Sequence, residues 1–193
     1  MSYQQTVEEY NKEYHTFKNM NKTTMTTTLA TTTNFQKVKE FNETFGLPTF
    51  TRPQTNVVNE HPQLTKLRQD LITEECEEFV QAVKDNNFTE MVDALADILY
   101  VVYGAGSSFG VDLDKAFSIV HESNMSKLCS SEKEAQETVE WYKHNQLDTY
   151  DSPTYRQSDN KKYWIVFNKS TGKILKSINY KKVKFDMDKL HLL

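Results

Sequence analysis

Two neighbouring helical segments that both carry carboxylates constrain this chain more than any other feature. The first contains Glu74-Glu75-Cys76-Glu77-Glu78, and the second contains Glu90-Met91-Val92-Asp93-Ala94-Leu95-Ala96-Asp97. Between them lies the short link Lys84-Asp85-Asn86-Asn87. Because short links join antiparallel neighbours in helical proteins, the fold must bring these acidic helices side by side.

A helical wheel separates the acids of the first segment. An α-helix advances about 100° per residue, and the apolar side chains of this segment share one broad arc: Leu64, Leu67, Leu71, Ile72, Phe79, Ala82 and Val83. Glu75 and Glu78 fall inside that arc and Glu74 lies at its edge, whereas Glu77 projects among polar residues. Three acids therefore point where apolar side chains belong.

The acids of the second segment form a single stripe. Glu90, Asp93 and Asp97 stand at positions i, i+3 and i+7, and the segment contains no Lys or Arg. Taken alone, the stripe is equally compatible with the solvated face of an amphipathic helix. Its pairing with a neighbour whose acids lie on an apolar face favours a functional site.

Converging carboxylates require protons or cations. Two carboxylates about 4 Å apart repel each other by roughly 4 kcal/mol at an effective dielectric constant near 20. Hard divalent cations take oxygen ligands, and Mg²⁺ keeps several waters and binds substrate phosphates. We therefore expect Mg²⁺, with Mn²⁺ as a substitute. A di-iron bundle, which uses Glu-x-x-His motifs, is disfavoured because neither acidic helix contains His.

Charge and cysteine content narrow the class of protein. The 193 residues carry a net charge of -4, so the chain as a whole has no electrostatic attraction to a nucleic-acid polymer or an anionic membrane. Cys76 and Cys129 are too few for a disulfide framework, which favours a reducing, cytoplasmic location. No apolar run approaches the roughly 20 residues of a membrane span.

The remaining patterns divide the chain into three parts. Residues 1–33 form an N-terminal extension, in which a short docking helix over residues 1–20 precedes a flexible, Thr-rich linker. Residues 34–128 form a helical domain. Its four predicted helices run from a cap at Asn34 to Gly46, from Pro62 to about Asp85, from Phe88 to about Ser108, and from a cap at Asp112 to about Leu128. The fold class is therefore all-α, an antiparallel four-helix bundle.

Residues 129–193 form a C-terminal extension with a small β-hairpin. The aromatic and β-branched stretch Tyr163–Phe167 is followed by a turn that contains Gly172 and then by Lys173–Ser177. This pattern predicts two paired strands at about residues 163–177.

The acidic motifs resemble those of the all-α nucleotide pyrophosphohydrolases, which include MazG-like proteins, dimeric dUTPases and phosphoribosyl-ATP pyrophosphohydrolases. The similarity continues in Phe109–Asp114 and Ser123–Lys127, and Gly172–Lys176 is similar to the G-K-[VI]-L-K segment of the phosphoribosyl-ATP pyrophosphohydrolase-like subgroup. Two features differ. Ala94 stands where many relatives have Glu, and Asn179–Lys184 lacks the prolines that many relatives have there.

The resemblance implies a Mg²⁺-dependent hydrolase that cleaves the α–β anhydride of a nucleoside triphosphate or related nucleotide into a monophosphate and pyrophosphate. Glu75, Glu78 and Asp97 are the expected metal ligands, and either Asp93 or Glu90 completes the shell. Glu74 is expected to orient or deprotonate the attacking water, or to serve as a further ligand.

Two residues are expected to bind the substrate. Asn124 and Lys127 share one helix face, where Lys127 would pair with phosphate and Asn124 with phosphate or sugar; the alternative is an ordinary exposed helix end. Arg68 either balances the acids or contacts substrate, or forms a surface salt bridge.

Relatives bury their bundle faces in dimers or tetramers, and the second acidic helix is apolar on almost every side, so we expect a homodimer or homotetramer. The alternative function is a non-catalytic interaction or regulatory module that retains the fold and a metal site. The substitution at Ala94 keeps that alternative open.

Overall fold

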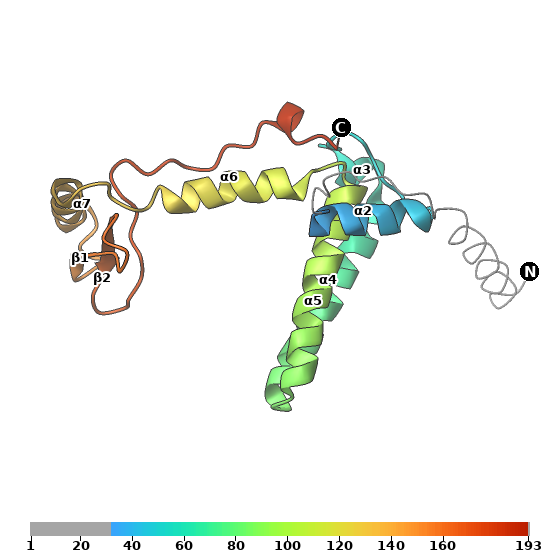
Figure 1. Ribbon diagram of the computed structural model, residues 1–193, viewed down its shortest axis with the longest axis horizontal. Helices are drawn as coiled ribbons and strands as arrows, with labels where there is room; N and C mark the ends of the chain where they lie inside the picture. Colours follow the sequence, from blue (N-terminus) through green and yellow to red (C-terminus); the bar gives the residue numbers. More distant parts are fainter. Residues whose placement is uncertain (1–31, 193) are drawn as a thin grey trace, which may run out of the picture. The chain divides into compact units, whose positions relative to one another are not determined.

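Helices dominate the computed structural model, which describes residues 32–192 (Figure 1). The helices of this part are α2 (Asn34–Thr44), α3 (Val57–Glu60), α4 (Pro62–Lys84), α5 (Phe88–Ser108), α6 (Leu113–Met125) and α7 (Glu132–Asn145). Two antiparallel strands, β1 (Pro153–Gln157) and β2 (Trp164–Asn168), and the 3-10 helix η1 (Met187–Lys189) complete it. The predicted, mostly helical class is confirmed. The predicted docking helix and most of the Thr-rich linker lie outside the described residues.

Helix α2 begins at a capping box. Thr33 Oγ1 accepts a hydrogen bond from Gln36 N at 3.2 Å, and Gln36 Oε1 accepts one from Thr33 N at 2.9 Å. The predicted cap at Asn34 was therefore wrong by one residue, because Thr33 has the extended backbone that a cap requires. Phe35 and Val38 of this helix are buried.

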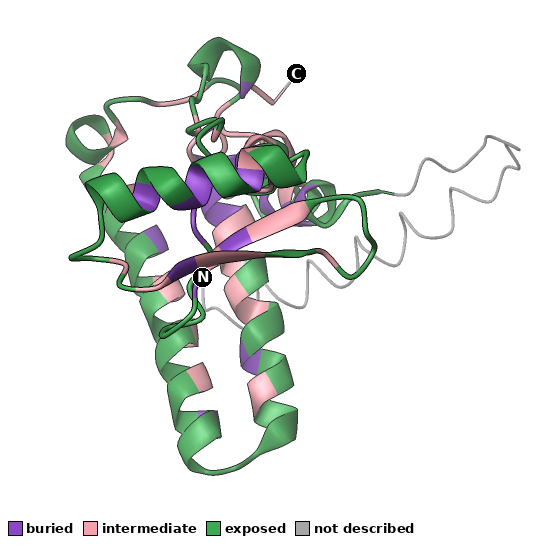
Figure 2. Ribbon diagram, turned by 90° about the vertical axis from the view of Figure 1, so that its left-hand side faces the viewer, coloured by how far each residue is buried: buried purple, intermediate pink, exposed green. Residues whose placement is uncertain are grey.

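Helices α4 and α5 form a hairpin and lie side by side along most of their length (Figures 1 and 2). Asn86 in the link has φ of +50°, a left-handed conformation that Asn tolerates. Asn87 Oδ1 then accepts from Glu90 N at 3.3 Å and caps α5. Ala82 and Ala94 are buried, and their small side chains let the two backbones approach closely.

Small residues at the end of α5 create the buried end of this hairpin. Residues 104–108 of α5 are all buried, and α2 packs against this helix. Asn42 of α2 donates from Nδ2 to Gly104 O at 3.3 Å, and Arg68 of α4 donates from Nε to Ser108 Oγ at 3.0 Å. A Cβ atom at Gly104 would lie 3.2 Å from Arg68 Nη1, so the absence of a side chain makes room for the guanidinium.

Helix α6 leaves α5 at a bend of 111°. It contacts α5 sparsely, in contrast to the long contact between α4 and α5. The part of the chain that the structure describes thus contains the predicted helices without showing a four-helix bundle. Within residues 32–192, no single helix is both long and apolar enough to cross a membrane; only α5 and α6 taken together, across their bend, reach that length and composition.

The predicted β-hairpin was wrong in its second strand. β2 pairs with β1, with Pro153 opposite Asn168 and Gln157 opposite Trp164, whereas residues 173–177 join β2 only through an isolated bridge between Ile174 and Phe167. After that bridge the backbone N–H groups turn to other acceptors. Lys176 N donates to Tyr142 Oη, Ser177 N to Lys127 O, and Ile178 N to Thr138 Oγ1. In a continued ladder Ser177 would lie opposite Trp164, but Cys129 takes that place and exchanges backbone hydrogen bonds of 2.8 and 2.9 Å with Trp164.

The C-terminal residues have their own core and then return towards α5 and α6. Side chains from α7, β2 and the following segment form a buried cluster: Cys129, Ala135, Val139, Tyr142, Val166 and Leu175. Past this core the chain runs beside α6 (Figure 1), where Leu190 O accepts from Asp112 N at 2.8 Å and Leu192 N donates to Thr51 O at 3.0 Å. Leu190 is only 2% exposed, which anchors the returning chain.

We predict that Gly110→Ala destabilises the protein far more than Gly46→Ala. Both glycines have positive φ, +74° and +63°, but a Cβ at Gly110 would lie 2.0 Å from Arg52 O, whereas the space at Gly46 is open. Gly46→Ala should cost about 1 kcal/mol from its backbone conformation. Gly110→Ala should cost roughly 2 kcal/mol more because the backbone of residue 52 must move. Urea unfolding followed by circular dichroism measures the difference, and equal losses would contradict the packing described here.

Candidate active site

The α4–α5 hairpin places four other carboxylates around Glu75. Burial, and then the negative charges of Glu78, Asp97, Glu74 and Asp93, raise the pKa of the Glu75 carboxyl above its usual value of 4.5. Glu75 and Asp97 are half-buried, whereas the other three are exposed. The acids predicted on two separate helices therefore act on one another across the hairpin.

Glu90 stands apart from this group. It lies in the first turn of α5, where its backbone N–H is capped by Asn87, and its charge is not among those that raise the pKa of Glu75. Of the two acids that the sequence offered as the completing ligand, Asp93 is the one whose charge acts on Glu75.

No cation of the described chain neutralises this acidic group. Its members form no ion pair within residues 32–192, where every salt bridge involves other carboxylates. Arg68 does not fill this role. It is 6% exposed and bonds Ser108, so neither the predicted balance of the acids nor the predicted surface salt bridge is formed. The reason is the space left by Gly104, which admits the guanidinium into the buried end of the hairpin.

Carboxylate oxygens are suitable ligands for a hard divalent cation, and their mutual repulsion favours one. The side chains are nevertheless not gathered as a finished ligand set: among the residues that the structure describes, no group of three or more His, Cys, Asp or Glu side chains is arranged to hold a metal ion. The donor chemistry fits Mg²⁺, and closing the shell requires the carboxylates to move together.

Asn124 and Lys127 meet each other at the end of α6. Lys127 Nζ donates to Asn124 Oδ1 at 2.7 Å, which agrees with their predicted common face. Within the described residues neither side chain bonds to the acids of α4 or α5. The structure thus places the predicted phosphate-binding pair and the acidic group in two separate sets of contacts.

The C-terminal segment joins the Asn124–Lys127 end, a connection that the sequence analysis missed. Ser123 Oγ donates to Lys181 O at 2.8 Å, and Ser126 Oγ accepts from Lys181 N at 2.9 Å. The available signal was composition: residues 161–184 contain eight lysines and no Asp or Glu. A basic stretch of that kind is expected near a site for anions.

We predict that Glu75→Gln stabilises the metal-free protein at neutral pH. An acid with a raised pKa binds its proton more tightly when folded, so folding loses stability as pH rises from 4.5 through the raised value. Removing the charge should add up to about 1 kcal/mol at pH 7.5 in EDTA, with little difference near pH 4. Glu77→Gln, on the opposite side of α4, is the matched control. Thermal unfolding that shows no gain over this control would contradict the clustering.

Comparison with known proteins identifies the family of this chain. The phosphoribosyl-ATP pyrophosphohydrolase family profile matches residues 38–124, a range that contains α4, α5 and every acid named above. The uncharacterized protein L479 of Acanthamoeba polyphaga mimivirus is 33% identical over 238 aligned positions, which cover 79% of this chain and 94% of that protein. The chain therefore belongs to the phosphoribosyl-ATP pyrophosphohydrolase family, within the MazG-like all-α NTP pyrophosphatase superfamily.

Proposed function

We propose that this protein is a Mg²⁺-dependent nucleotide pyrophosphohydrolase that splits the α–β anhydride of a nucleoside triphosphate or related nucleotide. The observation that carries the proposal is the pairing of α4 with α5, which brings Glu78, Asp97, Glu74 and Asp93 near enough to Glu75 for their charges to raise its pKa. Membership of the family supports hydrolysis of a nucleotide pyrophosphate bond in general. The choice of metal, of bond and of substrate belongs to the proposal.

The acids of the hairpin have two proposed roles, metal binding and acceptance of a proton from water. Glu75, Glu78 and Asp97 would hold Mg²⁺ with Asp93, and Mn²⁺ would bind the same oxygens. A bound ion of this kind neutralises phosphate charge and lowers the pKa of a coordinated water. Glu74, exposed at the edge of the group, would take the proton of the attacking water as its oxygen bonds to phosphorus and pyrophosphate leaves.

Asn124 and Lys127 would bind the substrate. The ammonium group of Lys127 is a point charge suited to phosphate, and the Asn124 amide can hydrogen-bond either phosphate or sugar. Their mutual hydrogen bond at 2.7 Å supports a paired role, because it holds the lysine in a defined position before a ligand arrives.

The exposed apolar face of the hairpin supports assembly into a homodimer or homotetramer. Six large apolar residues of α4 and α5 are each about half exposed: Leu67, Val80, Val83, Val92, Leu95 and Leu99. Packing this face on a second hairpin would bury it. Two hairpins joined in this way would form a bundle of four helices from two chains, which differs from the bundle predicted within one chain.

The decisive test of the proposed activity is pyrophosphate release from a panel of nucleotides. We predict turnover of at least one nucleotide with Mg²⁺, none in EDTA, and a loss of at least about 100-fold in Glu75→Gln. Glu77→Gln should retain activity because its side chain points away from the acidic group. Full activity of Glu75→Gln would show that the assigned site is wrong. Mg²⁺ binding without turnover of any nucleotide would favour a non-catalytic module.

The proposed assembly is tested by light scattering during size-exclusion chromatography. We predict a dimer or larger oligomer for the unmodified protein and a monomer for Leu99→Lys, because a buried ammonium would oppose apolar packing. Leu99 is 54% exposed in the chain. Val58→Lys, at a residue of α3 that is 64% exposed, is the control and should leave the oligomer intact. A monomeric unmodified protein would contradict the proposal.

A further inference from the structure

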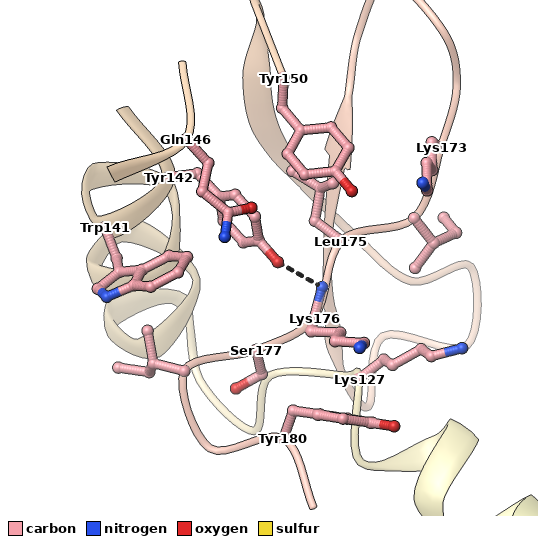
Figure 3. A pocket seen from close by; sticks show the side chains of 12 residues that line it. Lys127, Trp141, Tyr142, Gln146, Tyr150, Lys173, Leu175, Lys176, Ser177 and Tyr180 are labelled. Carbon is pink, nitrogen blue, oxygen red and sulfur yellow. Dashed lines mark hydrogen bonds between the residues drawn. The ribbon is translucent and has the colours of Figure 1, made fainter. Parts of the chain in front are cut away.

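A cavity of about 570 Å³ lies between α7 and the segment that follows β2 (Figure 3). Every residue that lines it follows the family-matched range 38–124. Trp141 of α7 and Gln146, just after α7, stand on one side of the cavity, Lys127 and Lys173 on the other, and Tyr180 at the bottom of the view. Its volume falls within the range that ordinary small-molecule ligands occupy.

The charge of this cavity is uniformly positive. Lys127, Lys173 and Lys176 line it, and no acidic residue does. Their described partners are neutral: Lys173 Nζ lies 5.2 Å from the centre of the Tyr150 ring, Lys176 Nζ lies 4.6 Å from that of Tyr180, and Lys127 bonds an amide oxygen. Three ammonium groups without a carboxylate partner, in a chain of net charge -4, form a local site for an anion.

The carboxylate of Glu134, which bonds the lining residue Ser177, is occupied by other donors. Glu134 accepts hydrogen bonds from the Ser177 hydroxyl and from the hydroxyl and backbone N–H of Ser130. Burial alone would raise the pKa of Glu134, but these hydrogen bonds outweigh it and hold the value at about 2. Because its oxygens are directed to Ser177 and Ser130, Glu134 fixes the wall of the cavity and leaves the lysines uncompensated.

The rim of the cavity also offers apolar and aromatic surface. Trp141, Ile174 and Ile178 are 43%, 49% and 44% exposed, although each is large and apolar. Beneath them, Tyr142 and Leu175 are buried, and Tyr142 Oη accepts from Lys176 N at 3.1 Å. A planar aromatic group placed against Trp141 would cover this surface, as bases do on exposed aromatic side chains.

We infer that this cavity is a nucleotide-binding site, in which Lys127, Lys173 and Lys176 bind the phosphates and Trp141 stacks on the base. A pocket of about 570 Å³ has the size of a small ligand, which favours a single nucleotide over a nucleic-acid polymer. The site shares Lys127 with the substrate-binding pair proposed above, and the residues that this inference adds are Lys173, Lys176 and Trp141. All of them lie outside the α4–α5 hairpin, so binding is expected whether or not the hairpin hydrolyses nucleotides.

The test is calorimetric titration of ATP in EDTA, where the acidic group lacks its metal. The double variant Lys173→Gln/Lys176→Gln should bind at least about tenfold more weakly, because two charge-assisted contacts are lost. Lys162→Gln/Lys169→Gln removes two exposed lysines of the same basic stretch that do not line the cavity, and should bind like the unmodified protein. Equal losses in both double variants, or in neither, would overturn the site.

Further titrations separate the ligand classes. Triphosphate alone and adenosine alone should each bind much more weakly than ATP, and Trp141→Ala should weaken ATP without changing triphosphate binding. An oligonucleotide that binds more tightly per site than ATP would overturn the assignment in favour of a polymer. Glu75→Gln should still bind ATP in EDTA. An unmodified protein that binds ATP but releases no pyrophosphate would contradict the proposed activity and support this site, whereas one that does neither would contradict both.

Discussion

Repulsion among the carboxylates of α4 and α5 is the interaction on which the rest of this structure depends. The negative charges around Glu75 oppose the pairing of α4 with α5 at neutral pH, so other contacts must hold the hairpin together. The buried Ala82 and Ala94 and the capped link at Asn86 and Asn87 bring the helices close. At the other end, Arg68 and Asn42 bind the small residues of α5.

The same hairpin is incomplete in a second respect, since its apolar residues are half exposed in a single chain. Repulsion among the carboxylates and exposure of the apolar side chains both destabilise a free hairpin. A bound cation would reduce the repulsion, and a second copy of the chain would bury the apolar side chains. The proposed metal site and the proposed assembly would thus stabilise the same hairpin in two separate ways.

The residues after α6 are held together by different interactions. Their core of small and aromatic side chains lies around α7 and β2, and side chains of α7 accept the backbone N–H groups of residues 176 and 178. Drawing residues 176–178 onto α7 leaves the lysines of that segment beside Trp141 and Tyr150. The positive cavity is therefore a consequence of how the segment is hydrogen-bonded, in addition to its composition.

Local patterns in the sequence were sufficient for the helices. The bounds of α4 and α5, the cap at Asp112 and the common face of Asn124 and Lys127 all follow from residues within a few positions of one another. The wheel also indicated which acids of α4 turn towards α5, because helical geometry fixes side-chain direction.

Only the tertiary structure decided the features that depend on distant residues. It paired β2 with β1 and limited residues 173–177 to a single bridge with β2, buried Arg68 beside Gly104, and made Asp93, not Glu90, act on Glu75. It also assembled one cavity from residues 127, 141–150 and 173–180. The physical reason is that a helix satisfies its own hydrogen bonds within four residues, whereas strand pairing, buried charge and cavities depend on which distant groups compete for the same partner.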